Sequence, residues 1–223
     1  MKYPNIKEGV FVNRCNRFVA EIEIDGAVQK CHVKNTGRLR ELLVPGAVCY
    51  LTGSDNPKRA TRYDLVAVQK GLQVVNIDSM APNQVAYEYL SQLYPNARIH
   101  KESVCGNSRL DFLVENGTRK LYIEVKGVTL REKNAAKFPD APTLRGVKHI
   151  RELIACKKAG HDAMLLFVVA MTGVDVVIPN RETQPEFEQA LREAKAAGVQ
   201  LLAVDCVVTS DSICAQSNIS VLV

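Results

Sequence analysis

The chain has 223 residues, of which 47% are hydrophobic and 24% charged, a balance typical of a globular protein with one large or two small domains. No apolar run approaches the roughly 18 residues of a membrane span, and the N-terminal segment MKYPNIKEGV has no apolar signal core. We therefore expect a cytoplasmic protein without a membrane partner. Residues 1–77 hold 12 Lys or Arg against 7 Asp or Glu, so they carry the whole net charge of +5. This asymmetry favours a polyanion partner, although such a modest excess also aids solubility.

The seven cysteines are scattered along the chain, and none of them forms a CxxC pair. An odd number of thiols without ligand spacing argues against a disulfide framework and against a zinc site. We expect the cysteines to be reduced residues of the core.

Residues 8–77 are predicted to form short strands separated by turns. The stretch 18–33, FVAEIEIDGAVQKCHV, alternates apolar and polar residues on both sides of Asp25-Gly26, which is a hairpin signal. Further strands are expected at 47–53, 63–69 and 72–78, with a polar, basic loop at 53–62. Several short strands within about 70 residues favour an OB-like β-barrel over residues 1–77, a fold that often binds single-stranded nucleic acid or a duplex backbone.

From residue 78 the pattern changes to alternating helices and strands. A helix is predicted at 81–93, where Val85, Ala86 and Leu90 share one face. Two strands at 108–114 and 120–130 flank an Asn116-Gly117 turn. The remaining predicted elements are a loop at 137–143, helices at 144–160 and 185–198, and strands at 163–171 and 199–208. This order predicts an α/β domain with a mixed sheet over residues 78–223.

The stretch LYIEVKGVTL, residues 121–130, places two charged side chains on one face of a strand. Side chains alternate along a strand, so Glu124 and Lys126 point to the face opposite Ile123 and Val125. A hairpin centred on Asn116-Gly117 pairs residues whose numbers sum to about 233, which brings Asp111 level with roughly residue 122 and therefore near Glu124. Either the pair is a solvated ion pair, or the strand carries a phosphate-handling site.

The second interpretation has a specific chemistry. Two neighbouring carboxylates repel each other unless a cation lies between them, and Mg²⁺ commonly binds through one or two carboxylates plus substrate phosphates. Such an ion would lower the pKa of a bound water, while Lys126 would hold that water or neutralise charge developing on the phosphate. The pattern acid-x(n)-Glu-x-Lys is the signature of the PD-(D/E)xK nuclease superfamily, in which a helix bearing an acid comes first. Glu88 fits that place, or it is a solvated charge at the flank of the helix.

Nearly end to end, the chain resembles the sugar fermentation stimulation protein A family. The resemblance rests on NRFVAEI, NTGRLRELLVPG and the SDNPKR loop, and on SRLDF, YIEVKGVTL and FPDAPTLRGVKHIREL. It implies an OB-like N-terminal domain and a nuclease-like C-terminal domain. It also implies largely sequence-independent DNA binding and a link to the regulation of sugar (maltose) metabolism. The motif implies an Mg-dependent phosphodiesterase or endonuclease, and a homodimer stays open because many such nucleases pair to cut two strands.

The resemblance implies a catalytic set of Asp111, Glu124, Lys126 and Glu88, with Mg²⁺ or Mn²⁺ on the three carboxylates. Arg145 and Lys148 at the start of a helix either contact a phosphate or are solvated, since cations there oppose the helix dipole unless an anion is bound. His149 is either a proton shuttle or a packed side chain.

In the first domain the candidate contacts to the DNA backbone are basic residues, because few aromatic side chains are available for stacking on bases. They are Arg14, Arg17, Lys34, Arg38, Arg40, Lys58, Arg59 and Arg62. Gly37 in NTGRLR either offers backbone N–H groups to a phosphate or forms a plain turn of the barrel.

Three functions remain open on the sequence. The protein is a metal-dependent DNA nuclease, a DNA-binding regulator with a degenerate and inactive nuclease fold, or a module that binds RNA or a nucleotide. Loss of cleavage in Asp111→Ala and Lys126→Ala would favour the first function. Salt-sensitive binding that survives both substitutions would favour the second, and competition between DNA and RNA would test the third.

Overall fold

The computed structural model describes residues 1–54, 56, 58–106 and 108–223. The helices are α1 (Ala81–Leu93), α2 (Leu144–Lys158) and α3 (Pro185–Ala196). The strands are β1 (Ile6–Asn16), β2 (Val19–Ile24), β3 (Ala27–Val33), β4 (Val48–Gly53), β5 (Tyr63–Lys70), β6 (Gln73–Asn76), β7 (Arg98–Cys105), β8 (Ser108–Asn116), β9 (Arg119–Val128), β10 (Leu130–Glu132), β11 (Ala135–Phe138), β12 (Asp162–Val169), β13 (Val176–Pro179), β14 (Gln200–Val208) and β15 (Ile213–Val221).

The first six strands form the OB-like barrel that the sequence predicts. Their order is β3-β2-β1-β4-β5-β6, and a parallel contact between β3 and β5 closes β1 to β5 into a barrel. The Asp25-Gly26 turn joins β2 to β3 with both residues at positive φ, the conformation that a tight hairpin turn requires. Inward-facing residues such as Ile22, Leu51 and Leu65 are fully buried. Residues 55 and 57 of the predicted basic loop lie outside the described residues.

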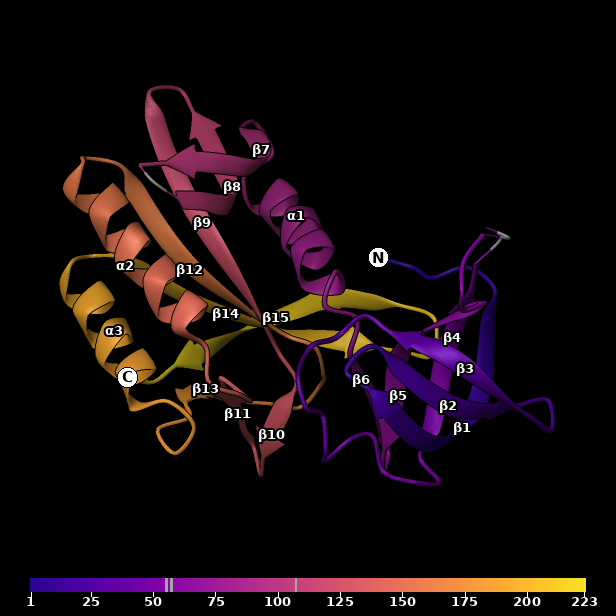
Figure 1. Cartoon of the computed structure of the whole chain (residues 1–223). Coiled ribbons are helices and arrows are strands. Elements are labelled where there is room, and N and C mark those ends of the chain that lie inside the picture. Colours follow the sequence, from indigo (N-terminus) through magenta and orange to yellow (C-terminus); the bar gives the residue numbers. More distant parts are fainter. Residues whose placement is uncertain (55, 57, 107) are drawn as a thin grey trace.

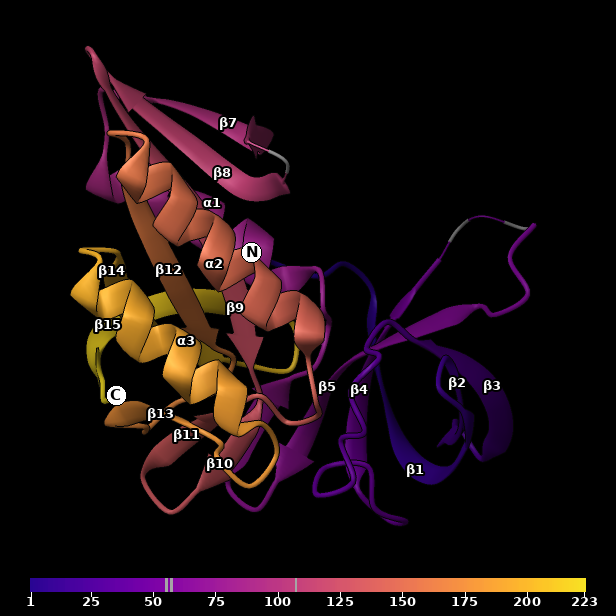
Figure 2. The same ribbon diagram turned by 60° about the vertical axis from the view of Figure 1, so that its left-hand side comes forward.

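The remaining strands form a mixed sheet with helices on both faces, as predicted for an α/β domain. The strand order is β10-β11-β13-β15-β14-β12-β9-β8-β7. Helix α1 covers one face, and α2 and α3 lie side by side on the other (Figures 1 and 2). The two faces of β9 follow this division, because Ile123 and Val125 pack in the core under α1, whereas Tyr122 packs on the α2 side.

The β8–β9 hairpin has a register two residues away from the predicted one. Phe112 pairs with Ile123 and Asn116 with Arg119, so paired numbers sum to 235. The loop consists of Gly117, which has a φ of 62°, and Thr118, so the turn centre lies one position later than predicted. The correction places Asp111 level with Glu124 instead of residue 122.

Several strands escaped prediction because their sequences lack apolar alternation. β7 and β15 are rich in polar residues, and most of their side chains are exposed or only partly buried. β10, β11 and β13 have three or four residues each, too few to show a period of two. β11 overlaps the start of the predicted loop at 137–143.

The cysteine prediction was wrong in two respects. Cys105, at the end of β7, forms a disulfide with Cys156 near the end of α2, and 51 residues separate them in sequence. The two cysteines meet because α2 packs beside strands β7 and β8, and the spacing of cysteines along the sequence does not show this packing. Cys15 and Cys214 are exposed instead of buried. Burial raises the pKa of the three remaining thiols to about 12, as expected for unreactive core residues: Cys31, Cys49 and Cys206.

Several contacts join the barrel to the second domain. The chain start pairs with the segment between β14 and β15, where the Tyr3 amide donates to the Asp211 carbonyl at 2.7 Å. The Lys34 ammonium lies 3.2 Å from Asp64 in the barrel and 3.4 Å from Asp78, just ahead of α1. Within the described residues, the helices are all too short or too polar to cross a bilayer.

Candidate active site and the groove that leads to it

Asp111 lies where β8 and β9 separate. The ladder between them ends at Phe112 and Ile123, and beyond it the Asp111 carboxylate takes the place of a backbone acceptor. The Val125 amide donates to Asp111 Oδ2 at 2.8 Å, and the Asn83 side chain donates to Oδ1 at 2.9 Å. These two bonds fix the carboxylate at the opening between the strands.

Glu124 supplies a second carboxylate, and its side chain is almost completely buried, with 3% of its surface exposed. One oxygen, Oε1, accepts hydrogen bonds from the Lys126 ammonium and from Nδ1 of His149 in α2. The other oxygen, Oε2, is buried and has no hydrogen-bond partner. A buried carboxylate oxygen without a donor costs free energy, so it marks a position where a bound cation or donor would be stabilised.

The pKa of Asp111 lies above its ordinary value. Burial is the largest cause and the charge of Glu124 the second, while the Val125 amide, Asn83 and Lys126 act in the opposite direction. A raised pKa at a carboxylate facing a second carboxylate is the electrostatic pattern expected where a cation binds.

These groups line one pocket of about 370 Å³. Its lining residues are Ser79, Asn83, Glu102, Arg109, Leu110, Asp111, Glu124, Val125, Lys126, Arg145 and His149. The structure therefore brings Asp111, Glu124 and Lys126 together, as the sequence predicted. It adds Asn83, which the sequence did not single out, and His149, which the sequence left open as a proton shuttle or a packed side chain.

Glu88 does not join the pocket, contrary to the prediction. Its carboxylate accepts from the Met1 ammonium at 2.7 Å and from Gln84 at 2.9 Å. The first turn of α1 approaches β9, so Asn83 faces the pocket, and Glu88 lies about 140° further around the helix. The sequence shows the amphipathic face of α1 but not which end of the helix meets the strands.

Asp111 and Glu124 are the residues that could hold a divalent metal. Among the described residues no group of three or more His, Cys, Asp or Glu side chains forms a metal cluster. Mg²⁺ does not need one, because it keeps several waters and binds through one or two carboxylates and substrate phosphates. The all-oxygen donor pair and the unpartnered Glu124 oxygen fit such an ion.

A row of four adjoining pockets, called the groove below, leads from the barrel to the Asp111 site. A pocket of about 350 Å³ on the barrel shares Arg17, Thr36 and Gly37 with the next, of about 370 Å³, which the loop 138–143 completes. That one shares Asn35 and Asp140 with a narrower section of about 170 Å³. The narrow section in turn shares Ser79, Asn83 and Val125 with the Asp111 pocket. The groove thus connects both halves of the molecule.

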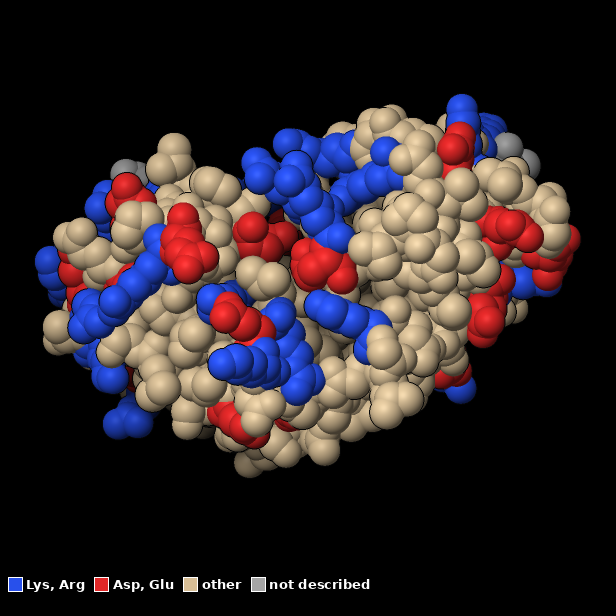
Figure 3. Space-filling model, turned by 90° about the horizontal axis from the view of Figure 1, so that it is seen from below, with Lys and Arg blue, Asp and Glu red and all other residues tan. Residues whose placement is uncertain are grey.

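Basic side chains are concentrated at the two ends of the groove. Arg17, Arg38 and Arg40 are exposed and line the barrel end, and Arg145 lines the far end. Seen from below, Lys and Arg side chains gather near the middle of the molecule, with acidic side chains among them (Figure 3). Gly37 lies close to the loop 138–143, because a Cβ there would lie 2.5 Å from the Asp140 carboxylate, which would have to move.

Three of the predicted DNA contacts have their donors engaged within the protein. The four terminal N–H groups of Arg14 donate to the carbonyls of Arg17, Asn35, Gly37 and Arg38, at 2.7–2.9 Å. Lys34 bridges two aspartates, and Arg59 makes two hydrogen bonds to Asp64. Their positive charges hold loops and carboxylates in place in this conformation, and their assignment as DNA contacts stays a prediction.

The other predicted contacts are exposed but lie off the groove. Arg62 stacks over the Tyr63 ring, with its guanidinium carbon 5.6 Å from the ring centroid. Lys58 and Lys148 are exposed, and neither lines the groove. Their assignment as DNA contacts stays a prediction.

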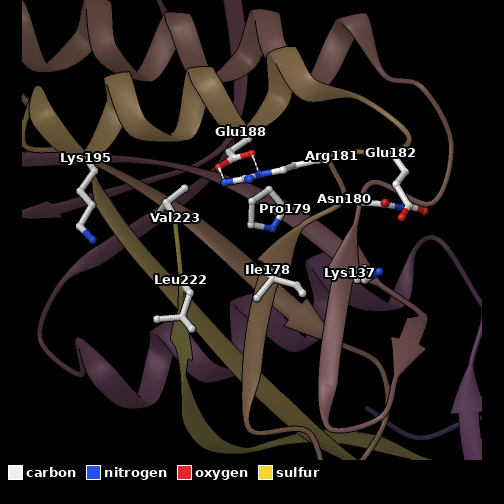
Figure 4. A pocket seen from close by; sticks show the side chains of 10 residues that line it. All are labelled: Lys137, Ile178, Pro179, Asn180, Arg181, Glu182, Glu188, Lys195, Leu222 and Val223. Carbon is white, nitrogen blue, oxygen red and sulfur yellow. Dashed lines mark hydrogen bonds and ion pairs between the residues drawn. The ribbon is translucent and has the colours of Figure 1, made fainter.

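A larger pocket of about 460 Å³ lies at the opposite side of the second domain, between the end of β13, α3 and the last two residues (Figure 4). Its floor is apolar, and Glu188 beside it is paired with Arg181 and Arg192. Neither Asp111 nor Glu124 lines this pocket, so it has no part in the site.

Comparisons with known proteins match both halves of the chain. A family model described as "SfsA N-terminal OB domain" matches residues 12–77, and one described as "Sugar fermentation stimulation protein RE domain" matches residues 80–212. A sugar fermentation stimulation protein homolog of Ruminiclostridium cellulolyticum is 52% identical over 211 residues, 93% of either chain. One from Desulfitobacterium hafniense is 50% identical, covering 96% of this chain and 94% of its own. The solved structure of Pyrococcus furiosus SfsA in complex with Ca²⁺ is 30% identical, with a TM-score of 0.90 over 100% of this chain and 98% of that one.

Proposed function

Because the chain belongs to the sugar fermentation stimulation protein family, we propose that it binds DNA without marked sequence preference and that its second domain is a metal-dependent DNA endonuclease. The observation that carries the proposal is the buried, unpartnered oxygen of Glu124 beside Asp111, whose pKa is raised. Two carboxylates held in this way, next to a lysine and at the end of a groove, suit phosphodiester hydrolysis better than a purely structural ion pair.

Mg²⁺ or Mn²⁺ is the cofactor that the donor set fits, with Asp111 and Glu124 as its protein ligands. When bound, the metal would polarise a phosphate oxygen and lower the pKa of a coordinated water. The relative from Pyrococcus furiosus was solved with Ca²⁺, another hard cation that prefers oxygen ligands, which supports an oxygen-based site in this chain.

Lys126 has a separate role in this proposal. Its ammonium contacts Glu124, and 14% of the side-chain surface is exposed to the pocket, so its charge faces the space where a phosphate would lie. There it would neutralise the negative charge that develops on the phosphoryl oxygens. A lysine next to two carboxylates also keeps the net charge of the site low enough for a polyanion to approach.

The groove supports DNA as the substrate. Arg17, Arg38 and Arg40 would contact phosphates at the barrel end, and Arg145 would contact one beside the carboxylates. Contacts to phosphates position a strand without reading its sequence, so binding is expected to tolerate any sequence and to weaken as salt rises.

The test is cleavage of plasmid and single-stranded DNA with Mg²⁺, Mn²⁺ or EDTA, together with DNA binding by fluorescence anisotropy. We expect cleavage with either metal, none with EDTA, and a loss of at least about 100-fold in Asp111→Asn and in Lys126→Met. Lys158→Ala, at the exposed end of α2 and outside the groove, is the matched control and should cleave normally.

Two outcomes would overturn the nuclease proposal. Cleavage that persists in both site variants would come from a contaminating enzyme. Salt-sensitive binding by the wild-type protein without cleavage under any metal condition would leave a non-catalytic DNA-binding regulator. RNA that competes as well as DNA would overturn the choice of DNA.

A further inference from the structure

Arg145, His149 and Glu124 form a chain of contacts from the groove to the buried carboxylate. Arg145 Nε lies 3.3 Å from His149 Nε2, and His149 Nδ1 contacts Glu124 Oε1. We propose that His149 is a positioning residue that holds Glu124 in the orientation needed for metal binding, and that Arg145 fixes the tautomer in which it does so. This inference rests on the proposed metal site.

The geometry determines which nitrogen of His149 carries the proton. An arginine N–H can only donate, so His149 Nε2 must be the acceptor of the bond from Arg145. A neutral imidazole with an unprotonated Nε2 has its proton on Nδ1, and that N–H points at Glu124, whose ionised oxygen can only accept. Both contacts are satisfied by this one tautomer.

The contact with His149 decides which oxygen of Glu124 is available. Lys126 and His149 both approach Oε1, so Oε2 is left without a donor although it is buried. Because donors on one oxygen restrict rotation of the carboxylate, they also fix the position of the free oxygen, in a side chain that lines the same pocket as Asp111. Carboxylate ligands of metals are commonly held in this way by hydrogen bonds from behind.

His149 is well placed for this role and poorly placed for direct contact with DNA. Only 11% of its side-chain surface is exposed, and both ring nitrogens are engaged. Arg145 is exposed one turn earlier in α2 and lines the same pocket. A phosphate held by its guanidinium would fix Arg145 and, through it, the imidazole behind Glu124. Substrate binding and metal binding would then support each other.

The test compares two substitutions of His149 that differ in one donor. In His149→Asn the side-chain amide keeps an N–H near the position of Nδ1, whereas His149→Leu fills the space without a donor. The control is His100→Leu, which removes a histidine–glutamate contact of the same kind, 3.0 Å to Glu115, from an exposed site. Mn²⁺ binding without DNA, followed by electron paramagnetic resonance, is the main readout, and far-UV circular dichroism verifies folding.

We expect His149→Leu to weaken Mn²⁺ binding about 10- to 100-fold, His149→Asn to stay within a few-fold of wild type, and His100→Leu to bind normally. At saturating Mn²⁺ the cleavage rate of His149→Leu should largely recover. A His149→Leu protein that binds Mn²⁺ as tightly as wild type would overturn the inference. Equal losses in the Asn and Leu variants would also overturn it, because packing would then explain the effect. A wild-type protein without Mn²⁺ binding would overturn the proposed metal site as well.

Nitrogen-15 NMR of the imidazole tests the role of Arg145, since its cross-peak pattern separates the two neutral tautomers. His149 should be protonated on Nδ1 in the wild-type protein, and Arg145→Leu should produce a mixture of tautomers. An unchanged spectrum in Arg145→Leu, or a proton on Nε2 in the wild-type protein, would contradict the assignment.

Discussion

Two aspartates, a buried one in the barrel and a partly buried one in the second sheet, have opposite electrostatic environments. Burial by itself raises the pKa of Asp64, but its contacts with Arg59 and Lys34 bring the pKa below its ordinary value. Burial also raises the pKa of Asp111, and the neighbouring Glu124 raises it further. The fold balances the first carboxylate, whereas it holds the second at a free-energy cost that a bound cation would remove.

The cations of the barrel divide in the same way. Arg14 donates its hydrogen bonds to backbone carbonyls and Lys34 contacts carboxylates of the protein, while Arg17 and Arg38 are exposed in the groove. Residue type therefore does not identify a ligand-binding charge. What identifies it is whether the folded protein already supplies its partners.

The largest effect should come from breaking the balanced aspartate. Asp64→Asn leaves Arg59 without a counter-ion and Lys34 with Asp78 alone, so the free energy of unfolding should fall by about 2–3 kcal/mol. Urea denaturation at pH 7 measures it. A loss below about 0.5 kcal/mol would mean that both cations relax into solvent, which would remove the contrast between the two sites.

The same substitution at the unbalanced aspartate should act in the opposite direction. Asp111→Asn removes one of two facing charges and keeps an oxygen for the Val125 amide, so the metal-free protein should gain up to about 1 kcal/mol at pH 7. Mn²⁺ should raise the melting temperature of the wild-type protein but not of this variant. Thermal melts with EDTA and with Mn²⁺ measure both effects, and destabilisation of the metal-free variant would show that Asp111 is a structural residue.

The core of the site could be predicted from sequence because it lies on a hairpin. The Asn116-Gly117 signal and a period of two were enough to place Asp111 near Glu124 and Lys126. The observed register differs by two residues from the predicted one and brings Asp111 level with Glu124. Because the turn and the strand pattern determine the hairpin, the positions of the site residues on its strands could be predicted from nearby sequence.

The helical residues of the site could not be predicted in the same way. Asn83 and His149 reach the pocket because α1 and α2 dock on opposite faces of the sheet at particular heights. An amphipathic pattern gives the face that a helix buries but not its position along the strands. Glu88 was chosen on the order of elements alone, and the disulfide between Cys105 and Cys156 depends on the same docking.

The pH dependence of stability should separate the two aspartates. The folded-state pKa of Asp111 is raised, so its favourable contribution is full at low pH and is lost as pH rises from about 3.9, the ordinary aspartate value, through the folded-state pKa. The advantage of Asp111→Asn over wild type should therefore vanish below that window and reach its maximum above it. Asp64 has a lowered pKa, so its contribution is full above about 3.9 and is lost as pH falls. Urea denaturation between pH 3 and 7 with EDTA measures both, and parallel curves for Asp111→Asn and wild type would contradict the raised pKa.

The smallest effect concerns the exposed cations of the groove. If Arg17, Arg38 and Arg40 each neutralise a phosphate, each alanine variant should reduce the slope of log affinity against log salt by about 0.7–0.9, with the same loss for every DNA sequence. Lys30→Ala is the matched control, because Lys30 is exposed on β3 and lies outside the groove. Anisotropy titrations at several salt concentrations measure the slopes. If the slope of log affinity against log salt is the same for the Lys30 and groove variants, the groove arginines do not contact phosphates, because each phosphate contact releases counter-ions. The DNA would then bind elsewhere on the barrel.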